Sequence, residues 1–184
     1  AFLDADDYWE FNKLSKVKKH IEITKSQVIC HNEFERGGKE LIFKKLFHGQ
    51  YTNFNDLFFK GNVISTSAVI IERSIFDKIG YFNEDKSFIG VEDYDMWLRI
   101  LTENIKINYM RDFLGTCVTH SKNMSSQYTY LDRVEYLLIY YSKELDLLKL
   151  GHVLKYKFRL IRFYYSKTKK AITMRKYYDL LTIS

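Results

Sequence analysis

The hydrophobic positions along this chain change their period several times. In residues 8–23 apolar side chains recur at near-helical spacing, which predicts an amphipathic helix. The side chains that carry this period are Tyr8, Phe11, Leu14, Val17 and Ile21. Before this helix, Phe2 and Leu3 are predicted as the end of a buried strand. After it, residues 26–45 are predicted as two strands of a hairpin around a Gly-Gly pair.

The rest of the chain alternates between short strands and helices. We expect, in order, a loop with a short helix, a buried strand, a short helix, a longer helix and two further strands. These segments are residues 51–61, 62–71, 74–80, 91–104, 105–110 and 113–120. From Tyr128 onward the pattern is helical. Strands interleaved with helices predict an α/β fold, in which the two kinds of element form separate layers.

Composition narrows the class of protein. With 184 residues, of which 46% are hydrophobic, the chain can form one domain, or one domain with an appendage. The sequence has no uncharged apolar run of about 18 residues, so no transmembrane helix is expected. The two cysteines, Cys30 and Cys117, do not have the spacing of metal ligands. They are predicted as buried, reduced thiols of a cytoplasmic protein.

The positive charge is concentrated near the C-terminal end. The net charge is +6, and the segment from His152 to Tyr178 contains nine Lys or Arg residues and no Asp or Glu. We therefore predict a first region, residues 1–126, and a basic helical tail, residues 127–184. Such a tail suggests an anionic partner, either lipid headgroups or nucleic acid.

A first acidic group, Asp4, Asp6 and Asp7, follows the strand predicted at the start of the chain. Open α/β sheets bind ligands beyond the carboxyl ends of their strands. Mg²⁺ or Mn²⁺ suits such acids, because one or two carboxylates hold the ion and substrate phosphates complete its shell. The alternative is an acidic turn that caps the following helix. An EF-hand calcium loop is disfavoured, because Tyr8 and Trp9 stand where further ligands would be needed.

A second acidic pair, Glu92 and Asp93, begins the helix predicted for residues 91–104. These acids are candidates for a general base, or they stabilise the helix dipole at its N-terminus. Asp95 and Arg99 have i,i+4 spacing and are predicted as a structural ion pair.

Together the two acidic segments resemble family 2 glycosyltransferases, which have the GT-A fold. "FLDADDYW" is similar to the DxD motif of that family. Residues 62–99 are similar to its acceptor-side strand and ED motif, and "VTHSKNMSS" to a segment with a His shortly before a Ser. The resemblance runs from residue 1 to about residue 126. It implies a Rossmann-related mixed sheet flanked by helices, here followed by a C-terminal helical tail.

The resemblance also implies roles for individual residues. Asp4 corresponds to the first DxD acid, near the donor sugar, and is also a candidate metal ligand. Asp6 corresponds to the acid that holds Mn²⁺ or Mg²⁺ on the donor diphosphate. Asp7 is a neighbouring donor-site residue. Asp93 corresponds to the general base, with Glu92 beside it. His120 corresponds to a position that approaches the metal or the diphosphate in some relatives.

The implied reaction is an inverting sugar transfer without a covalent intermediate. A nucleotide sugar, with UDP as the expected nucleotide, is the donor, and a hydroxyl of a glycan or of a lipid-linked saccharide is the acceptor. The process would be cell-envelope or capsular polysaccharide synthesis. Since the family holds the nucleotide with βαβ units that precede its DxD motif, we expect roughly 60–100 further residues before Phe2. The alternative is an inactive, glycosyltransferase-like fragment that serves as a scaffold or binding module.

The basic tail can be interpreted in two ways. Leu154, Phe158, Ile161 and Tyr165 form one helical stripe, and basic residues form the stripe beside it. Such a helix can lie on an anionic membrane, which predicts a cytoplasmic protein that is peripheral on the inner face of the membrane. Alternatively, the helix packs on the first region. Nucleic acid is not expected as a partner, because no nucleic-acid-binding motif is present.

Overall fold

The computed structural model describes residues 1–37, 42–48, 53–120, 123, 128–144 and 155–169. The first half contains the strands and helices β1 (Tyr8–Trp9), α1 (Lys13–Thr24), β2 (Val28–Gly37), β3 (Ile42–Leu46) and α2 (Phe54–Lys60). The second half contains η1 (Thr66–Ala68), β4 (Val69–Ile71), α3 (Arg73–Ile79), η2 (Lys86–Phe88), α4 (Glu92–Thr102), β5 (Ile107–Thr119) and α5 (Tyr128–Glu144). The elements η1 and η2 are short 3₁₀ helices. Residues 155–169 are also helical.

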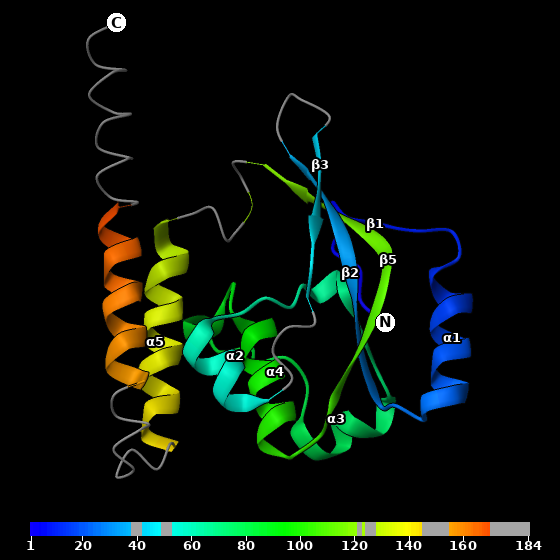
Figure 1. Ribbon diagram of the computed structural model, residues 1–184. Coiled ribbons are helices and arrows are strands. Elements are labelled where there is room, and N and C mark those ends of the chain that lie inside the picture. The colour runs from blue at the N-terminus through cyan, green and yellow to red at the C-terminus, as the bar shows by residue number, and fades with distance from the viewer. Residues whose placement is uncertain (38–41, 49–52, 121–122, 124–127, 145–154, 170–184) are drawn as a thin grey trace, which may run out of the picture.

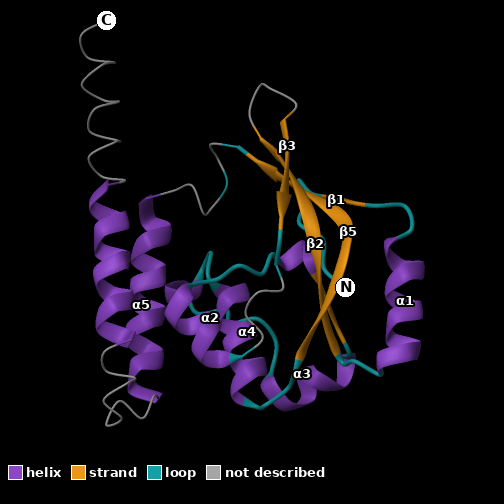
Figure 2. Ribbon diagram, in the orientation of Figure 1, coloured by secondary structure: helices purple, strands orange, loops and turns teal. Residues whose placement is uncertain are grey.

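The strands form one mixed sheet (Figure 2). Its order is β1-β5-β2-β3, and β4 pairs with the start of β2. The two long strands β2 and β5 run parallel, whereas β1, β3 and β4 pair with their neighbours in antiparallel orientation. The hairpin predicted for residues 26–45 is therefore confirmed by β2 and β3.

Helices cover both faces of this sheet (Figure 1). On one face α1 closes a small apolar cluster that includes Val17, Ile29 and Leu114. On the other face α2, α3 and α4 contribute to the main core, where Met96 and Trp97 of α4 are fully buried. The predicted α/β architecture, a mixed sheet flanked by helices, is confirmed.

The first helix differs from its prediction. It begins at Lys13, and the preceding Tyr8 lies in strand β1. Of the predicted apolar face only Val17 is buried; Phe11 and Leu14 are exposed. Lys13 is fully buried instead. Its ammonium group donates a hydrogen bond to the Ser67 carbonyl oxygen at 2.7 Å and lies 4.1 Å from the centre of the Trp9 ring.

Four predicted strands also differ. Residues 2–3 lie outside the sheet, and Phe2 packs edge-on against Phe76 and Phe82. Within residues 62–71 only β4 is a strand, because the preceding Thr66–Ala68 form η1. The two strands predicted for residues 105–120 are one strand, β5, and its pairing with β2 shifts register between His31 and Phe34.

The described parts of the tail, α5 and residues 155–169, pack on the rest of the protein. Val134, Leu137 and Leu138 of α5 belong to the main core, and so does Phe163 in the helical residues 155–169. The two helical segments lie side by side in Figure 1. The outer surface of residues 155–169 keeps an exposed stripe of Phe158, Ile161 and Tyr165, whereas Leu154 lies outside the described residues. Within the described part of the chain, no helix is long and apolar enough to cross a membrane.

Candidate active site

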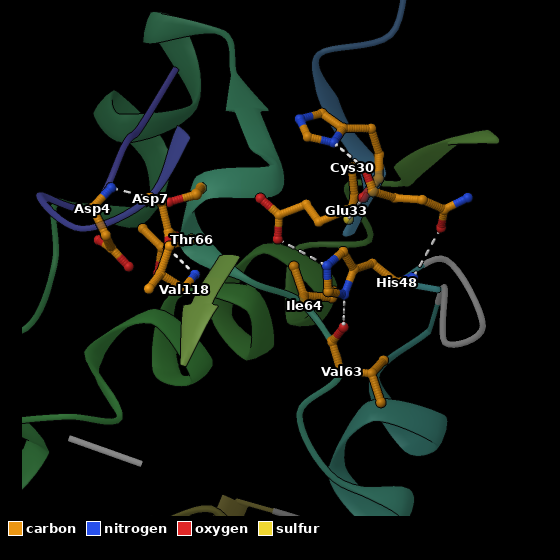
Figure 3. Close-up of polar contacts among 12 residues, drawn as sticks. Asp4, Asp7, Cys30, Glu33, His48, Val63, Ile64, Thr66 and Val118 are labelled. Atoms are coloured by element: carbon orange, nitrogen blue, oxygen red, sulfur yellow. Dashed lines mark hydrogen bonds and ion pairs between the residues drawn. The ribbon is translucent and has the colours of Figure 1, made fainter. Parts of the chain in front are cut away.

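The first acidic group forms a turn that is fixed to η1 and β5. The Asp7 amide donates to the Asp4 carbonyl oxygen at 3.1 Å, and the Asp4 amide donates to the Ser67 hydroxyl at 3.0 Å. The buried Asp7 carboxyl accepts a hydrogen bond from the Val118 amide at 2.9 Å (Figure 3). Asp7 therefore anchors the turn to β5.

Asp6 points to a different set of partners. His120 Nε2 lies 3.0 Å from Asp6 Oδ2, and the Asn123 amide donates to the same oxygen at 3.3 Å. Asn123 also accepts a hydrogen bond from the backbone amide of His120. The structure thus brings together Asp6 and His120, two of the three residues, with Asp4, that sequence analysis assigned to the metal. Asn123, which sequence analysis did not single out, holds both of them.

The second acidic pair lies in the first turn of α4. The Glu92 carboxylate accepts a hydrogen bond from the Gly90 amide. Asp93 Oδ1 accepts from the Tyr94 amide at 2.6 Å, and Asp93 Oδ2 accepts from the Thr66 hydroxyl at 3.3 Å. The Asn62 side chain lies 3.4 Å from the same Asp93 oxygen. Burial, reinforced by the Glu92 charge, raises the pKa of Asp93 to about 7.

The two acidic groups belong to one site. Both groups hydrogen-bond to η1, the Asp4 amide to the Ser67 hydroxyl at 3.0 Å and Asp93 to the Thr66 hydroxyl at 3.3 Å. In keeping with this, the charge of Asp4 contributes to the raised pKa of Asp93, and the charge of Glu92 contributes to the raised pKa of Asp4. The main cause at Asp4 is partial burial, followed by the charges of Asp7 and Asp6. A group of carboxylates that repel one another is suited to a cation or to hydrogen-bond donors of a ligand.

Buried polar residues contact the segment that leads into η1 and η1 itself. Besides the Lys13 contact, Glu33 and His48 form a buried pair with Glu33 Oε2 3.0 Å from His48 Nε2. His48 Nδ1 in turn lies 2.6 Å from the Val63 carbonyl oxygen, close to the segment that carries Thr66 (Figure 3). The other Glu33 oxygen is buried and has no hydrogen-bond partner among the residues that the structure describes.

The side chains around Asp6 supply some of the ligands that a hard divalent cation needs. Among the described residues, no group of three or more His, Cys, Asp or Glu side chains is arranged to hold a metal ion. Asp6 and His120 nevertheless place one carboxylate and one imidazole in contact. Mg²⁺ and Mn²⁺ are commonly held by one or two carboxylates, with substrate phosphates completing the shell. A two-residue protein site of this kind is therefore compatible with either metal bound together with a phosphorylated substrate.

Part of the chain is similar in sequence to known proteins. No protein-family model matches the chain. The chain is 31% identical over 106 residues to the UDP-Glc:alpha-D-GlcNAc-diphosphoundecaprenol beta-1,3-glucosyltransferase WfaP of Escherichia coli, which covers 58% of this chain and 39% of WfaP. It is 30% identical over 110 residues to WfgD of the same organism, which carries the same enzyme name; this covers 56% of the chain and 38% of WfgD.

A third relative is the uncharacterized glycosyltransferase MJ1057 of Methanocaldococcus jannaschii. It is 25% identical over 117 residues, which are 62% of this chain and 39% of MJ1057. All three of these relatives are named as glycosyltransferases. It spans about two fifths of the length of the curated relatives that it matches.

The structure places the predicted site residues as follows. Asp4 and Asp7 lie in the turn beside η1, Asp6 contacts His120, and Glu92 and Asp93 begin α4. Their roles in binding and catalysis stay predictions. Sequence analysis missed Asn62, Thr66 and Ser67. The visible signal for the last two was a run of three hydroxyl residues, Ser65 to Ser67, that interrupts an apolar segment.

Proposed function

We propose that the chain is part of a family 2, inverting glycosyltransferase that requires Mn²⁺ or Mg²⁺. The observation that carries this proposal is the convergence of Asp4 and Asp93. The Asp4 amide donates a hydrogen bond to the Ser67 hydroxyl, and the neighbouring Thr66 hydroxyl donates one to Asp93, so one short element, η1, contacts both residues although they are far apart in sequence. The names of the related proteins support sugar transfer as the reaction class.

In the proposed reaction Asp93 is the general base. An acceptor hydroxyl at Asp93 would lose its proton to the carboxylate while its oxygen attacks the anomeric carbon of the donor sugar. A pKa of about 7 suits this role, because the carboxylate is deprotonated near neutral pH but still basic enough to take a proton. Attack from the face opposite the leaving diphosphate inverts the anomeric centre. Glu92 lies beside the base and would orient the acceptor.

The donor diphosphate belongs on the side of Asp6 and His120. These two residues would hold the divalent cation, which when bound neutralises charge on the leaving diphosphate. Asp4 would lie near the donor sugar, and Asp7 fixes the turn that carries Asp4 and Asp6. The donor itself is proposed to be a UDP-sugar, because the names of WfaP and WfgD specify UDP-glucose.

The acceptor is proposed to be a lipid-linked saccharide of polysaccharide synthesis, as in the names of the same two relatives. Such a substrate resides at a membrane. The exposed stripe of Phe158, Ile161 and Tyr165, next to basic residues, supports peripheral attachment to an anionic membrane. Because the chain spans two fifths of its relatives, activity is proposed for the full-length gene product.

The test is a transfer assay with the full-length gene product, UDP-glucose, Mn²⁺ and GlcNAc linked through diphosphate to a lipid. Asp93→Asn should lower kcat about 10²–10⁴-fold, the contribution of a general base. Asp77→Asn is the matched control, because Asp77 is an exposed acid on α3. Full activity in the Asp93→Asn variant would refute the assignment of the base. An inactive wild-type protein with several nucleotide sugars would favour the scaffold alternative.

A further inference from the structure

A cavity of about 260 Å³ lies between the tail and the start of α4. Its polar lining comes from four segments that are distant in sequence: Asn62, Tyr94, Tyr130, Arg159, Arg162 and Ser166. No acidic side chain of the described residues lines it. Two guanidinium groups therefore face a polar cavity without a carboxylate to neutralise them.

The cavity adjoins the proposed base. Asn62 lines the cavity, and its side chain lies 3.4 Å from Asp93 Oδ2. Tyr130 also lines the cavity, and burial together with the charge of Asp93 raises the pKa of the Tyr130 hydroxyl. A molecule in the cavity would therefore be separated from the Asp93 carboxylate by about the width of one side chain.

Arg159 is positioned as an anion-binding group. Its guanidinium lies next to the buried Tyr94 hydroxyl, which itself donates to the Leu57 carbonyl oxygen at 2.8 Å. Its Nε is buried and has no hydrogen-bond partner in the described structure. Across residues 155–169 and the other described segments, neither Arg159 nor Arg162 forms an ion pair. Arginine pairs of this kind suit phosphate groups, which accept several charge-assisted hydrogen bonds at once.

The backbone at Gly61 passes close to the Arg159 guanidinium. Gly61 has φ 111°, a conformation that L side chains rarely adopt, and a Cβ there would lie 3.4 Å from Arg159 Nη2. A second cavity, of about 420 Å³, shares Arg159 and Arg162 with the first and continues to Lys155 and Phe158. Its lining includes one acid, Asp56, which is paired with Lys60 at 2.8 Å. The two arginines thus stand between the base and the exposed aromatic surface of the tail.

We propose that Arg159 and Arg162 bind the diphosphate of a lipid-linked saccharide acceptor. The inference rests on the proposed function. In such an acceptor one sugar separates the attacking hydroxyl from the diphosphate, and the lipid follows the diphosphate. The protein offers the same order: Asp93, the cavity with its two arginines, and the exposed stripe that contains Phe158 and Ile161.

The donor diphosphate fits this cavity less well. Asp4, Asp6 and His120 lie beside β5 and η1, whereas the cavity is bounded by α5 and residues 155–169, on the other side of α4 (Figure 1). The donor diphosphate and the acceptor diphosphate would therefore lie on different sides of Asp93. Transfer of the sugar from the donor to the acceptor hydroxyl requires this arrangement.

The test compares two water-soluble acceptors of the full-length gene product, both carrying GlcNAc on the same short alkyl chain. One has a diphosphate between sugar and chain, and the other is a simple glycoside. Arg159→Gln and Arg162→Gln should each raise KM for the diphosphate acceptor about tenfold, the loss expected for a hydrogen bond to a charged group. KM for the glycoside and for UDP-glucose should not change. Lys157→Gln, an exposed cation of the same helix outside both cavities, is the matched control.

Because the acceptors are soluble and no membrane is present, an effect of this kind cannot come from lipid headgroups. An unchanged KM for the diphosphate acceptor in both variants would overturn the inference while leaving the proposed function intact. So would an equal loss with both acceptors, or a raised KM for UDP-glucose. If the wild-type protein transferred sugar to neither acceptor, the proposed function would fail and the inference with it. Arg162 is exposed, so its variant keeps the test decisive if Arg159→Gln does not fold.

Discussion

The Thr66 hydroxyl donates a hydrogen bond to Asp93 at 3.3 Å, and the hydroxyl of the next residue, Ser67, accepts one from the Asp4 amide at 3.0 Å. Two adjacent hydroxyl residues of η1 therefore connect both acidic groups of the site. The buried Lys13 ammonium group also holds η1 in place, because it donates a hydrogen bond to the Ser67 carbonyl oxygen. The distance between the proposed base and the proposed donor site consequently depends on the position of η1.

The first prediction concerns the pH dependence of transfer. The Asp93 carboxylate must be deprotonated to act as a base, and burial raises its pKa to about 7. Below this pH, kcat/KM should rise about tenfold per pH unit, and above it kcat/KM should level off. The Thr66 hydrogen bond stabilises the charged form and so lowers the pKa. Thr66→Val should therefore move the rising limb to higher pH.

The measurement is kcat/KM for the acceptor between pH 5 and 9, about two units on either side of the Asp93 pKa. Thr102→Val is the control, because the Thr102 hydroxyl bonds to the Leu98 carbonyl oxygen at the far end of the same helix. A rising limb that stays in place in Thr66→Val would show that Asp93 does not control the profile.

The second prediction separates the roles of Asp6 and Asp7. Asp6→Asn removes a charged oxygen ligand and should weaken Mn²⁺ activation of transfer at least about tenfold. Asp7→Asn should instead lower thermal stability, because the buried Asp7 carboxyl accepts the Val118 amide. Mn²⁺ titrations of the transfer rate and thermal melts of both variants make the comparison. Equal metal dependence in wild type and Asp6→Asn would remove Asp6 from the metal site.

Sequence patterns predicted those parts of the protein that depend on local spacing. The helix at residues 91–104 was predicted from its apolar stripe, and the structure has α4 there, with Asp95 and Arg99 paired at 2.8 Å as expected. Likewise, the acids of the site belong to short motifs, so they could be singled out without knowing the fold.

Features that depend on distant contacts were missed. The helical period pointed Phe11 and Leu14 inward, but Lys13 is buried because its ammonium group finds the Ser67 carbonyl oxygen and the Trp9 ring. Similarly, Thr66 looked like one residue of a buried strand. Its hydroxyl contributes to the site only because folding brings Asp93 next to it. No residue close to Thr66 in the sequence predicts that contact.

The third prediction concerns the buried pair of Glu33 and His48. His48→Ala leaves the Glu33 carboxylate buried with neither oxygen paired, which should lower the free energy of unfolding by about 3–5 kcal/mol. The double variant Glu33→Leu/His48→Leu removes both polar groups and should lose clearly less. Urea unfolding of wild type and both variants measures the difference. A double variant less stable than His48→Ala would mean that the pair itself contributes most of the stability.

The last prediction concerns attachment of the tail to membranes. Phe163 faces the core, whereas Phe158 and Ile161 are 66% and 64% exposed on the outer surface of the same helix. Inserting such side chains into the interface of a bilayer removes apolar area from water, so Phe158→Ser/Ile161→Ser should weaken binding to anionic vesicles at least about tenfold.

Tyr81→Ser is the control, because Tyr81 is equally exposed, at 69%, but lies in the loop after α3. Flotation of the full-length gene product with vesicles of anionic and of neutral lipid measures the effect. Equal flotation of all three proteins would assign the helix to packing alone, whereas a loss confined to the double variant would place the lipid next to Arg162.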